Sequence, residues 1–381
     1  MTMRKLGSVT GCCTLAAILI GQPSRLAAQD TSSIWSVVPT PNHGPNNILL
    51  GISADSENDI WAAGDLVSLH FDGSKWSAIP VVGVNSGTQE ESLRGVAALA
   101  PNNVWAVGSR FIGSSQHNIS VIEHFDGTKW TVVASPHFKS GDVLNGVHAI
   151  SANDIYAVGS SRSDNATTMN ALIEHWDGSK WSVVPAPQLP VGQGIALNSL
   201  AVISSSDIWA VGSSGGLLPL APFAAHFDGR RWTPVTAHTA GPANFAGLQA
   251  VAAIATDDVW AVGLFEPSDG VAPRTLTEHW DGKQWNVVPS PNADQTDNEL
   301  FGVSAISSTD VWACGSSGGG FQVVIEHWDG TQWTISPSPQ PNAPSAHAVL
   351  AFPSGSVFVA GSTLSPAGGF NSLILHTTQG L

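Results

Sequence analysis

Histidine is the first residue type whose spacing in this chain suggests chemistry. One histidine returns in each of seven sequence units, and an acidic or polar residue stands ahead of it in the same unit. Histidine with a carboxylate serves in acid–base catalysis and in zinc binding. A zinc site needs several ligands converging on one point, which one histidine per unit does not supply. We therefore predict a structural hydrogen bond that satisfies buried polar groups. The histidines are His70, His124, His175, His226, His279, His327 and His376, and their expected partners are Asp59, Asn103, Asp154, Asp207, Asp258, Asp310 and Ser356.

A glutamate precedes four of these histidines directly: Glu123, Glu174, Glu278 and Glu326. Neighbouring residues of a strand point to opposite faces, so these carboxylates face away from the histidines. A general acid would need a partner that the sequence does not identify. We expect these four side chains to be exposed or loosely paired.

The 15 tryptophans could stack against sugar rings, yet each one occupies a repeated position. Because such rings bury a large apolar area, we interpret them as wedges between neighbouring sheets. Those expected at the centre of a second strand are Trp61, Trp105, Trp209, Trp260 and Trp312, with Tyr156 and Phe358 in the remaining units.

The loops differ among the units, and function concentrates in such loops. Arg110, Arg162, Glu266 and Arg274 lie in the loops between second and third strands, and we take them as candidate ligand-binding residues. In a propeller these loops emerge on the same face as the connections between units. We expect a ligand on that face or over the central channel.

Residues 294–299 form an acidic segment, Asp294-Gln-Thr-Asp297-Asn-Glu299. Its oxygen atoms could bind calcium, but the spacing matches no EF-hand loop. An acidic surface loop is the favoured interpretation. The sequence indicates no catalytic residues, metal site or cofactor.

The elements that position these residues follow from the repeat itself. A pair of motifs recurs with a period of roughly fifty residues, which is typical of β-propellers. In one repeat the motifs are Asp258-Val-Trp-Ala-Val-Gly263 and Glu278-His-Trp-Asp-Gly-Lys-Gln-Trp285. Each unit holds four short segments rich in Val, Ile and Trp, bounded by Gly, Asn, Asp, Ser and Pro. We call these strands a to d. The Asp-Gly step provides the positive φ that a tight hairpin between strands c and d requires.

The chain ends predict a closed ring of seven blades. The last unit lacks a strand d, and Ile34-Trp-Ser-Val-Val-Pro39 matches the strand d sequence Trp285-Asn-Val-Val-Pro289. A first strand that completes the last blade removes the exposed edge of an open array. The prediction is an all-β, seven-bladed propeller over residues 29–381. Its blades span about 47–82, 93–136, 144–187, 197–238, 248–291, 300–339, and 346–378 with 34–39.

Residues 1–28 have the pattern of a secretory signal. Arg4 and Lys5 precede the apolar run 12–21, and Leu26-Ala-Ala28 favours cleavage after Ala28. We therefore expect a secreted or periplasmic protein. The apolar run is too short to span a bilayer, which takes roughly 20 apolar residues, and no other segment is long enough, so no membrane insertion is expected. After cleavage Cys314 would remain alone, without a disulfide, as a small buried hydrophobe.

The charge balance excludes one class of partner. The chain has 29 acidic and 14 basic residues, for a formal net charge of −15. Proteins that bind nucleic acid need basic surfaces, so nucleic acid is not expected as a partner.

The repeat resembles the kelch-type, galactose-oxidase-like propeller repeat. The resemblance is carried by Val311-Trp-Ala-Cys-Gly315 and His327-Trp-Asp-Gly-Thr-Gln-Trp333, and it extends over nearly all of the expected mature chain. The second of these motifs is also similar to the Trp-rich repeats of seven-bladed fucose-binding lectins. Galactose oxidase builds its copper site from tyrosines and a modified cysteine, whereas this chain has 1 tyrosine, Tyr156, at a strand b position.

These observations favour a non-enzymatic, monomeric binding module whose ligand is a glycan or an extracellular protein. Two alternatives stay open, because a fold does not fix a function. One is an envelope scaffold without a small-molecule site, and the other is an unrecognised extracellular hydrolase or lyase.

Overall fold

The computed structural model describes residues 34–83, 91–113, 117–138, 140–162, 168–190, 192–216 and 220–378. These residues belong to one compact unit, Ser32–Leu381. The secondary-structure elements among these residues are all β-strands. The signal sequence expected at 1–28 and its cleavage after Ala28 lie outside the described residues.

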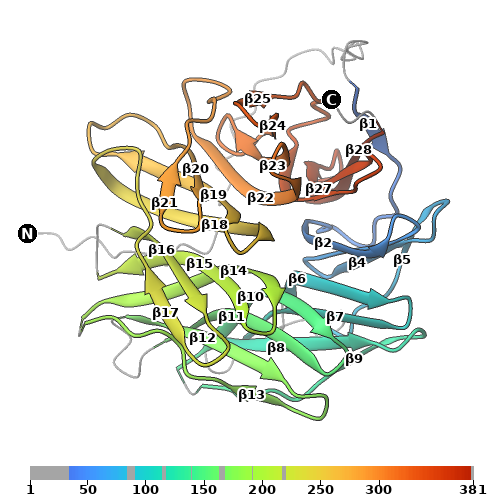
Figure 1. Ribbon diagram of the computed structural model, residues 1–381. Helices are drawn as coiled ribbons and strands as arrows, with labels where there is room; N and C mark the ends of the chain where they lie inside the picture. The colour runs from blue at the N-terminus through green and yellow to red at the C-terminus, as the bar shows by residue number, and fades with distance from the viewer. Residues whose placement is uncertain are drawn as a thin grey trace, which may run out of the picture. The chain divides into compact units, whose positions relative to one another are not determined.

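The strands form seven four-stranded antiparallel sheets, and each sheet is one blade of a seven-bladed propeller (Figure 1). In every blade the four strands lie in the order a, b, c, d. Strands a of neighbouring blades contact one another around the ring, so they are the innermost strands. They are β2 (Leu49–Ser56), β6 (Glu91–Ala100), β10 (Asp142–Ser151), β14 (Gly194–Ser204), β18 (Ala243–Ala255), β22 (Asn298–Ser307) and β26 (Ser345–Ala351).

Strands b and c form the middle of each blade. Strands b are β3 (Asp59–Gly64), β7 (Asn103–Ile112), β11 (Asp154–Arg162), β15 (Asp207–Gly215), β19 (Asp258–Pro267), β23 (Asp310–Ser317) and β27 (Val357–Leu364). Strands c are β4 (Val67–Phe71), β8 (His117–Phe125), β12 (Met169–Trp176), β16 (Ala221–Phe227), β20 (Arg274–Trp280), β24 (Gln322–Trp328) and β28 (Phe370–Thr377).

Strand d is the short outer strand, and six of the seven begin at a tryptophan. These strands are β5 (Trp76–Ala78), β9 (Trp130–Val132), β13 (Trp181–Val183), β17 (Trp232–Val235), β21 (Trp285–Val287), β25 (Trp333–Ile335) and β1 (Ser36–Val38). Strand β1 pairs with β28, with Val37 opposite Leu375. The N-terminal strand thus completes the last blade, as the chain ends predicted, and β28 is paired on both sides.

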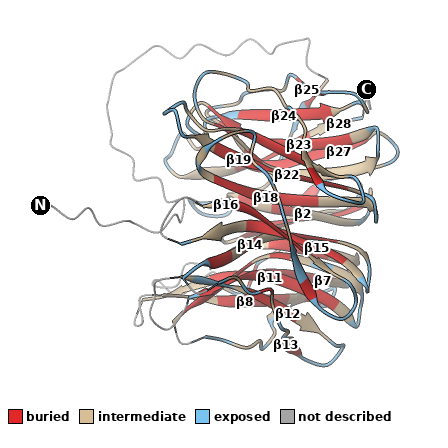
Figure 2. Ribbon diagram, turned by 60° about the vertical axis from the view of Figure 1, so that its left-hand side comes forward, coloured by how far each residue is buried: buried red, intermediate tan, exposed pale blue. Residues whose placement is uncertain are grey.

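The core lies between the blades. Aromatic rings of strand b meet strand d of the next blade, as in Trp209 and Trp285, whose ring centroids are 5.2 Å apart at 88°. The contact that closes the ring is of the same kind, because Trp312 lies 5.7 Å from Trp35 at 80°. Figure 2 shows buried residues along the middles of the strands and exposed residues at the turns. Cys314 is fully buried among these apolar residues, and burial raises the pKa of its thiol.

Strand b of every blade contains a glycine at the same position, and the structure explains why. A Cβ on Gly108 would lie 1.8 Å from the carbonyl oxygen of Ser92, and one on Gly263 would lie 2.0 Å from that of Gly247. Strand a therefore crosses this position too closely for any side chain. The close approach accompanies a β-bulge in strand a, one residue further along.

Six of the seven inner strands begin earlier than the repeat predicted, and β18 and β6 are examples. Strand β18 begins at Ala243, before the expected start at 248, because its first residues pair with the long end of β19 as far as Pro267. Strand β6 begins at Glu91, before the expected 93, and Glu91 pairs with Arg110. Both extensions lie at the end of the blade where the loops are long.

Candidate functional site

The histidine of strand c makes the expected hydrogen bond in all seven blades. Its Nε2 lies 2.6 to 3.0 Å from an oxygen of the residue that precedes or opens strand b. In blade 4, for example, His226 lies 2.8 Å from Asp207 Oδ1. The imidazole also packs on the strand b aromatic, with His226 and Trp209 centroids 4.7 Å apart. A contact repeated in every blade holds strands b and c together and does not mark one reactive centre.

The four glutamates are buried, which corrects the expectation that they are exposed or loosely paired. Glu123, Glu174, Glu278 and Glu326 each have an exposed fraction of 0%. The reason is that both faces of a blade are covered, so the face opposite the histidine also packs against a neighbour. Burial raises the pKa of each of these carboxyls to about 8.

The connection from the preceding blade covers at least two of these carboxyls. The backbone N–H of Val82 donates to Glu123 Oε1 at 3.0 Å, and that of His238 donates to Glu278 Oε2 at 2.9 Å. Neither oxygen of Glu174 has a hydrogen-bond partner among the residues that the structure describes. A protonated, enclosed carboxyl can act in catalysis only when substrate reaches it, and these four lie inside the blade interfaces.

The structure does not bring the four candidate loop residues together. Arg110 donates to the buried Glu91 carboxylate, so its charge is already paired. Arg162 is exposed at the end of β11. Glu266 pairs with Phe245 in the ladder of blade 5 and lines neither cavity described below. Of the four, Arg274 lines one of the two cavities described below, and the other three line neither.

The acidic segment 294–299 is organised by its own hydrogen bonds. Asp294 Oδ1 accepts from the backbone N–H and the hydroxyl of Thr296, at 2.7 and 2.6 Å. Asn298 Oδ1 accepts from Ala293 N at 2.7 Å. Across the part of the chain that the structure describes, no group of three or more His, Cys, Asp or Glu side chains is arranged to hold a metal ion. Nor do those residues form a helix long and apolar enough to cross a membrane.

The residues that line the central channel were not recognised from the repeat. In each strand a, the residue after the partner of the strand b glycine is skipped in the pairing, as Arg94 is between Leu93, the partner of Gly108, and Gly95. Bulges re-aim side chains and recur beside functional sites. The seven residues skipped at this bulge all line one cavity of about 220 Å³ on the axis of the ring. We call them the channel ring: Leu50, Arg94, Asn145, Asn198, Gln249, Phe301 and His347.

Small residues allow the seven strands to approach at this level. The residue after each ring position is Gly, Ser or Ala. A Cβ on Gly95 would lie 3.1 Å from Val147 N, and one on Gly302 would lie 3.0 Å from the Cα of Ala348. The ring is therefore narrow, and its side chains share one space.

One arc of the channel ring is polar and tied together. Arg94 Nη1 donates to Asn145 Oδ1 at 2.8 Å, across blades 2 and 3. Asn145 Nδ2 donates to Leu197 O at 2.8 Å, and Asn198 Nδ2 donates to Leu248 O at 2.9 Å. Burial lowers the pKa of Arg94, while the charge of Asp65 opposes that effect, and the guanidinium stays protonated.

The opposite arc is aromatic and apolar. The Phe301 and His347 rings lie 5.6 Å apart at 40°, and Leu50 follows them in the ring. Burial lowers the pKa of His347 to about 4, so its imidazole is neutral at pH 7. The channel ring thus presents a cation and amides on one side and rings on the other.

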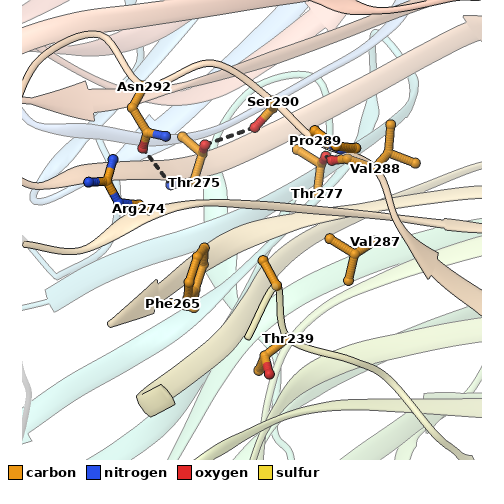
Figure 3. A pocket seen from close by; sticks show the side chains of 11 residues that line it. Thr239, Phe265, Arg274, Thr275, Thr277, Val287, Val288, Pro289, Ser290 and Asn292 are labelled. Carbon is orange, nitrogen blue, oxygen red and sulfur yellow. Dashed lines mark hydrogen bonds between the residues drawn. The ribbon is translucent and has the colours of Figure 1, made fainter. Parts of the chain in front are cut away.

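A second cavity, of about 420 Å³, lies in blade 5 beside the connection from blade 4. Phe265, Val287, Val288 and Pro289 provide most of its apolar lining, and Arg274, Asn292 and Thr239 provide polar groups. Figure 3 shows Arg274 and Asn292 at the same end of this cavity. None of its lining residues belongs to the channel ring.

Comparison with known proteins identifies the fold of this chain but does not assign it to a family. No family model matches the chain, and no curated protein matches it. Solved structures that resemble it include YCF48 bound to a D1 peptide, with TM-score 0.58, 13% identity and coverage of 92% of this chain and 96% of that one. YCF48 from Cyanidioschyzon merolae has TM-score 0.55 at 16% identity, over 90% of this chain and 98% of that one.

An enzyme stands among the similar structures as well. A polysaccharide lyase, ulvan lyase bound to a GlcA–Rha3S saccharide, has TM-score 0.58 at 8% identity, over 87% of this chain and 93% of that one. Identities this low carry the fold alone, and fold does not determine function. The chain is a seven-bladed β-propeller, a fold that suits a binding module.

Proposed function

We propose that the protein is a non-enzymatic recognition module that holds a segment of another protein at the channel ring. The observation that carries the proposal is the contrast between ring and framework. Glycine, aromatic and histidine positions repeat from blade to blade, whereas the seven bulged residues are Leu, Arg, Asn, Asn, Gln, Phe and His. A position with only a structural role would be expected to carry the same residue type in every blade, as the framework positions do.

The asymmetry of the ring supports one ligand and not several equivalent ones. A polypeptide segment offers carbonyl and amide groups to Asn198 and Gln249, and an apolar side chain to Phe301. A carboxylate on that segment would meet Arg94. Convergent polar groups beside an apolar wall are the usual composition of a small binding site.

A similar structure supports a peptide as the class of ligand, but not a particular peptide. One of the similar structures is described as YCF48 bound to a D1 peptide. Our proposal also keeps export, from the leader pattern at 1–28, and a monomeric state. The proposal also includes a kelch-like repeat type. The aromatic residue and the glycine of strand b support it, as does the tryptophan at the start of strand d.

Selection from a random peptide library displayed on phage, with the immobilised full-length protein, tests the proposal. We expect enriched peptides whose affinity falls about tenfold, or 1.4 kcal/mol, in a double variant Gln249→Ala/Phe301→Ala. The matched control is Thr256→Ala, an exposed residue beyond the other end of the same strand as Gln249. It should bind normally.

Two results would overturn the protein ligand. Enriched peptides that bind the double variant as tightly as the native chain would place the site elsewhere. An empty selection together with saturable, sugar-competed binding on a glycan array would make the ligand a glycan, the alternative that the sequence left open.

A further inference from the structure

The cavity of blade 5 has features that the other blades do not reproduce. At the register position of Phe265, blades 3, 4 and 6 carry Ser161, Ser214 and Ser317. Phe265 pairs across the sheet with Arg274, the first residue of strand β20. Blade 5 therefore places an aromatic ring and a guanidinium side by side, where blade 4 pairs Ser214 with Ala221 and blade 6 pairs Ser317 with Gln322.

Arg274 has no ion-pair partner among the described residues. Another arginine singled out at a blade end, Arg110, is neutralised by Glu91. The chain has about twice as many acidic as basic residues, so a half-buried arginine without an acid is not explained by a shortage of carboxylates. A guanidinium offers two parallel N–H groups, a geometry that suits a carboxylate.

The remaining polar groups of the cavity are partly used by the fold. Asn292 Oδ1 accepts from Thr275 N at 3.1 Å, which leaves the Nδ2 of that amide as a donor. The Thr239 hydroxyl donates to Gly241 O at 2.6 Å, and the Ser290 hydroxyl donates to Thr275 Oγ1 at 2.8 Å. The free groups are thus donors, Arg274 and the Asn292 amide, and Figure 3 shows them at the same end of the cavity.

From this geometry we propose that the blade 5 cavity is a second binding site, which takes a carboxylate attached to an apolar body. The carboxylate pairs with Arg274 and accepts from Asn292, while the apolar body packs on Phe265 and Val287. A volume of about 420 Å³ lies within the range of small-ligand sites. The site is independent of the channel ring, because no residue lines both cavities.

Two sources carry this chemistry, a free organic acid and the C-terminal residue of a peptide. Isothermal titration of the full-length protein should use N-acetyl-phenylalanine, its carboxamide, and the peptide Gly-Gly-Gly-Phe with a free C-terminus. We expect the acid to bind and the carboxamide to bind at least tenfold more weakly. If Gly-Gly-Gly-Phe alone binds, the ligand is the C-terminus of a peptide. If N-acetyl-phenylalanine alone binds, the ligand is a free organic acid.

Matched variants locate the binding. Arg274→Gln keeps a polar side chain and should lower affinity for the acid at least tenfold, whereas Arg162→Gln, at the exposed end of strand b in blade 3, should not. Phe265→Ser introduces the residue that three other blades carry, so it should fold and lose affinity for both acid and carboxamide. Urea unfolding of each variant shows whether it is folded.

Three results overturn the inference. They are the absence of binding by either acid at millimolar concentration, equal binding of acid and carboxamide, and unchanged affinity in folded Arg274→Gln. The channel ring proposal survives each of them, because its variants and its peptide readout are different.

Discussion

Arg94 of blade 2 donates from Nη1 to Oδ1 of Asn145 in blade 3, over 2.8 Å. The same asparagine donates from Nδ2 to Leu197 O in blade 4. One amide therefore spans two blade boundaries and fixes the direction of the guanidinium in the channel. The cation belongs to a rigid frame, which is the condition for orienting a ligand without a large entropic cost.

This relationship predicts that Asn145 acts on the ligand through Arg94. For peptides selected on the native protein, Asn145→Ala should lower affinity nearly as much as Arg94→Gln, by about tenfold. Fluorescence anisotropy of a labelled peptide measures the affinity. Asn198→Ala loses an equivalent bond between blades without touching Arg94, so it calibrates the cost to stability. Unchanged affinity in a destabilised Asn145→Ala would show that the asparagine only joins the blades.

The hydrogen bond between His226 and Asp207 predicts an unequal pair of substitutions. Asp207→Asn should be nearly neutral, because Asn103 already accepts from His124 in blade 2, at 2.9 Å. His226→Ala should cost about 2–3 kcal/mol, since it leaves a polar oxygen unpaired and removes the ring packed on Trp209. Urea unfolding at pH 7 gives both values. Equal costs for the two variants would mean that the charge of Asp207, and not the hydrogen bond, is what matters.

The sequence predicted the framework because the framework repeats. Histidine, tryptophan and Asp-Gly positions recur, and their recurrence implies contacts made once per blade. The burial of Glu174 was not predicted, because strand alternation was applied as if one face of strand c met solvent. The channel ring was also missed. A one-residue bulge leaves no periodic signal, and Arg94 stands inside an apolar segment where it resembles an ordinary strand residue. The four candidate ligand-binding residues were predicted in loops between strands b and c, but all four lie in strands, because strands b and c extend further than the repeat indicated: Arg110 in β7, Arg162 in β11, Glu266 in β19 and Arg274 in β20.

The buried glutamates predict that stability falls as pH rises. The pKa of Glu174 is about 8 in the folded protein against an ordinary value of 4.5. The folded state keeps the proton that the unfolded state loses, so stability is full below pH 4.5 and declines until about pH 8. The slope is about 1.4 kcal/mol per pH unit for each such carboxyl. Urea unfolding between pH 4.5 and 9 measures it.

Substitution by leucine isolates the contribution of one carboxyl. Blades 1 and 7 carry Leu69 and Leu375 at the position of Glu174. Glu174→Leu should therefore fit, stabilise the protein at pH 8 by more than about 1 kcal/mol, and reduce the pH slope. Glu278→Leu should gain less, because it removes the acceptor of His238 N. A slope that Glu174→Leu leaves unchanged would contradict burial of a protonated carboxyl.

The glycine of strand b in blade 5, Gly263, predicts contrasting effects on stability for two substitutions of glycine by alanine. In Gly263→Ala the new methyl would lie 2.0 Å from Gly247 O, in the strand that carries the bulge, so strand a must move. The expected cost is more than about 3 kcal/mol, the range of forced backbone shifts. Gly247→Ala is the matched control, since its nearest neighbour would be Ser213 Cβ at an ordinary 3.5 Å. Because Gln249 sits in the displaced bulge, a folded Gly263→Ala should also lose affinity for ring-selected peptides, whereas Gly247→Ala should keep it. Full affinity in a destabilised Gly263→Ala would separate the bulge from ligand binding.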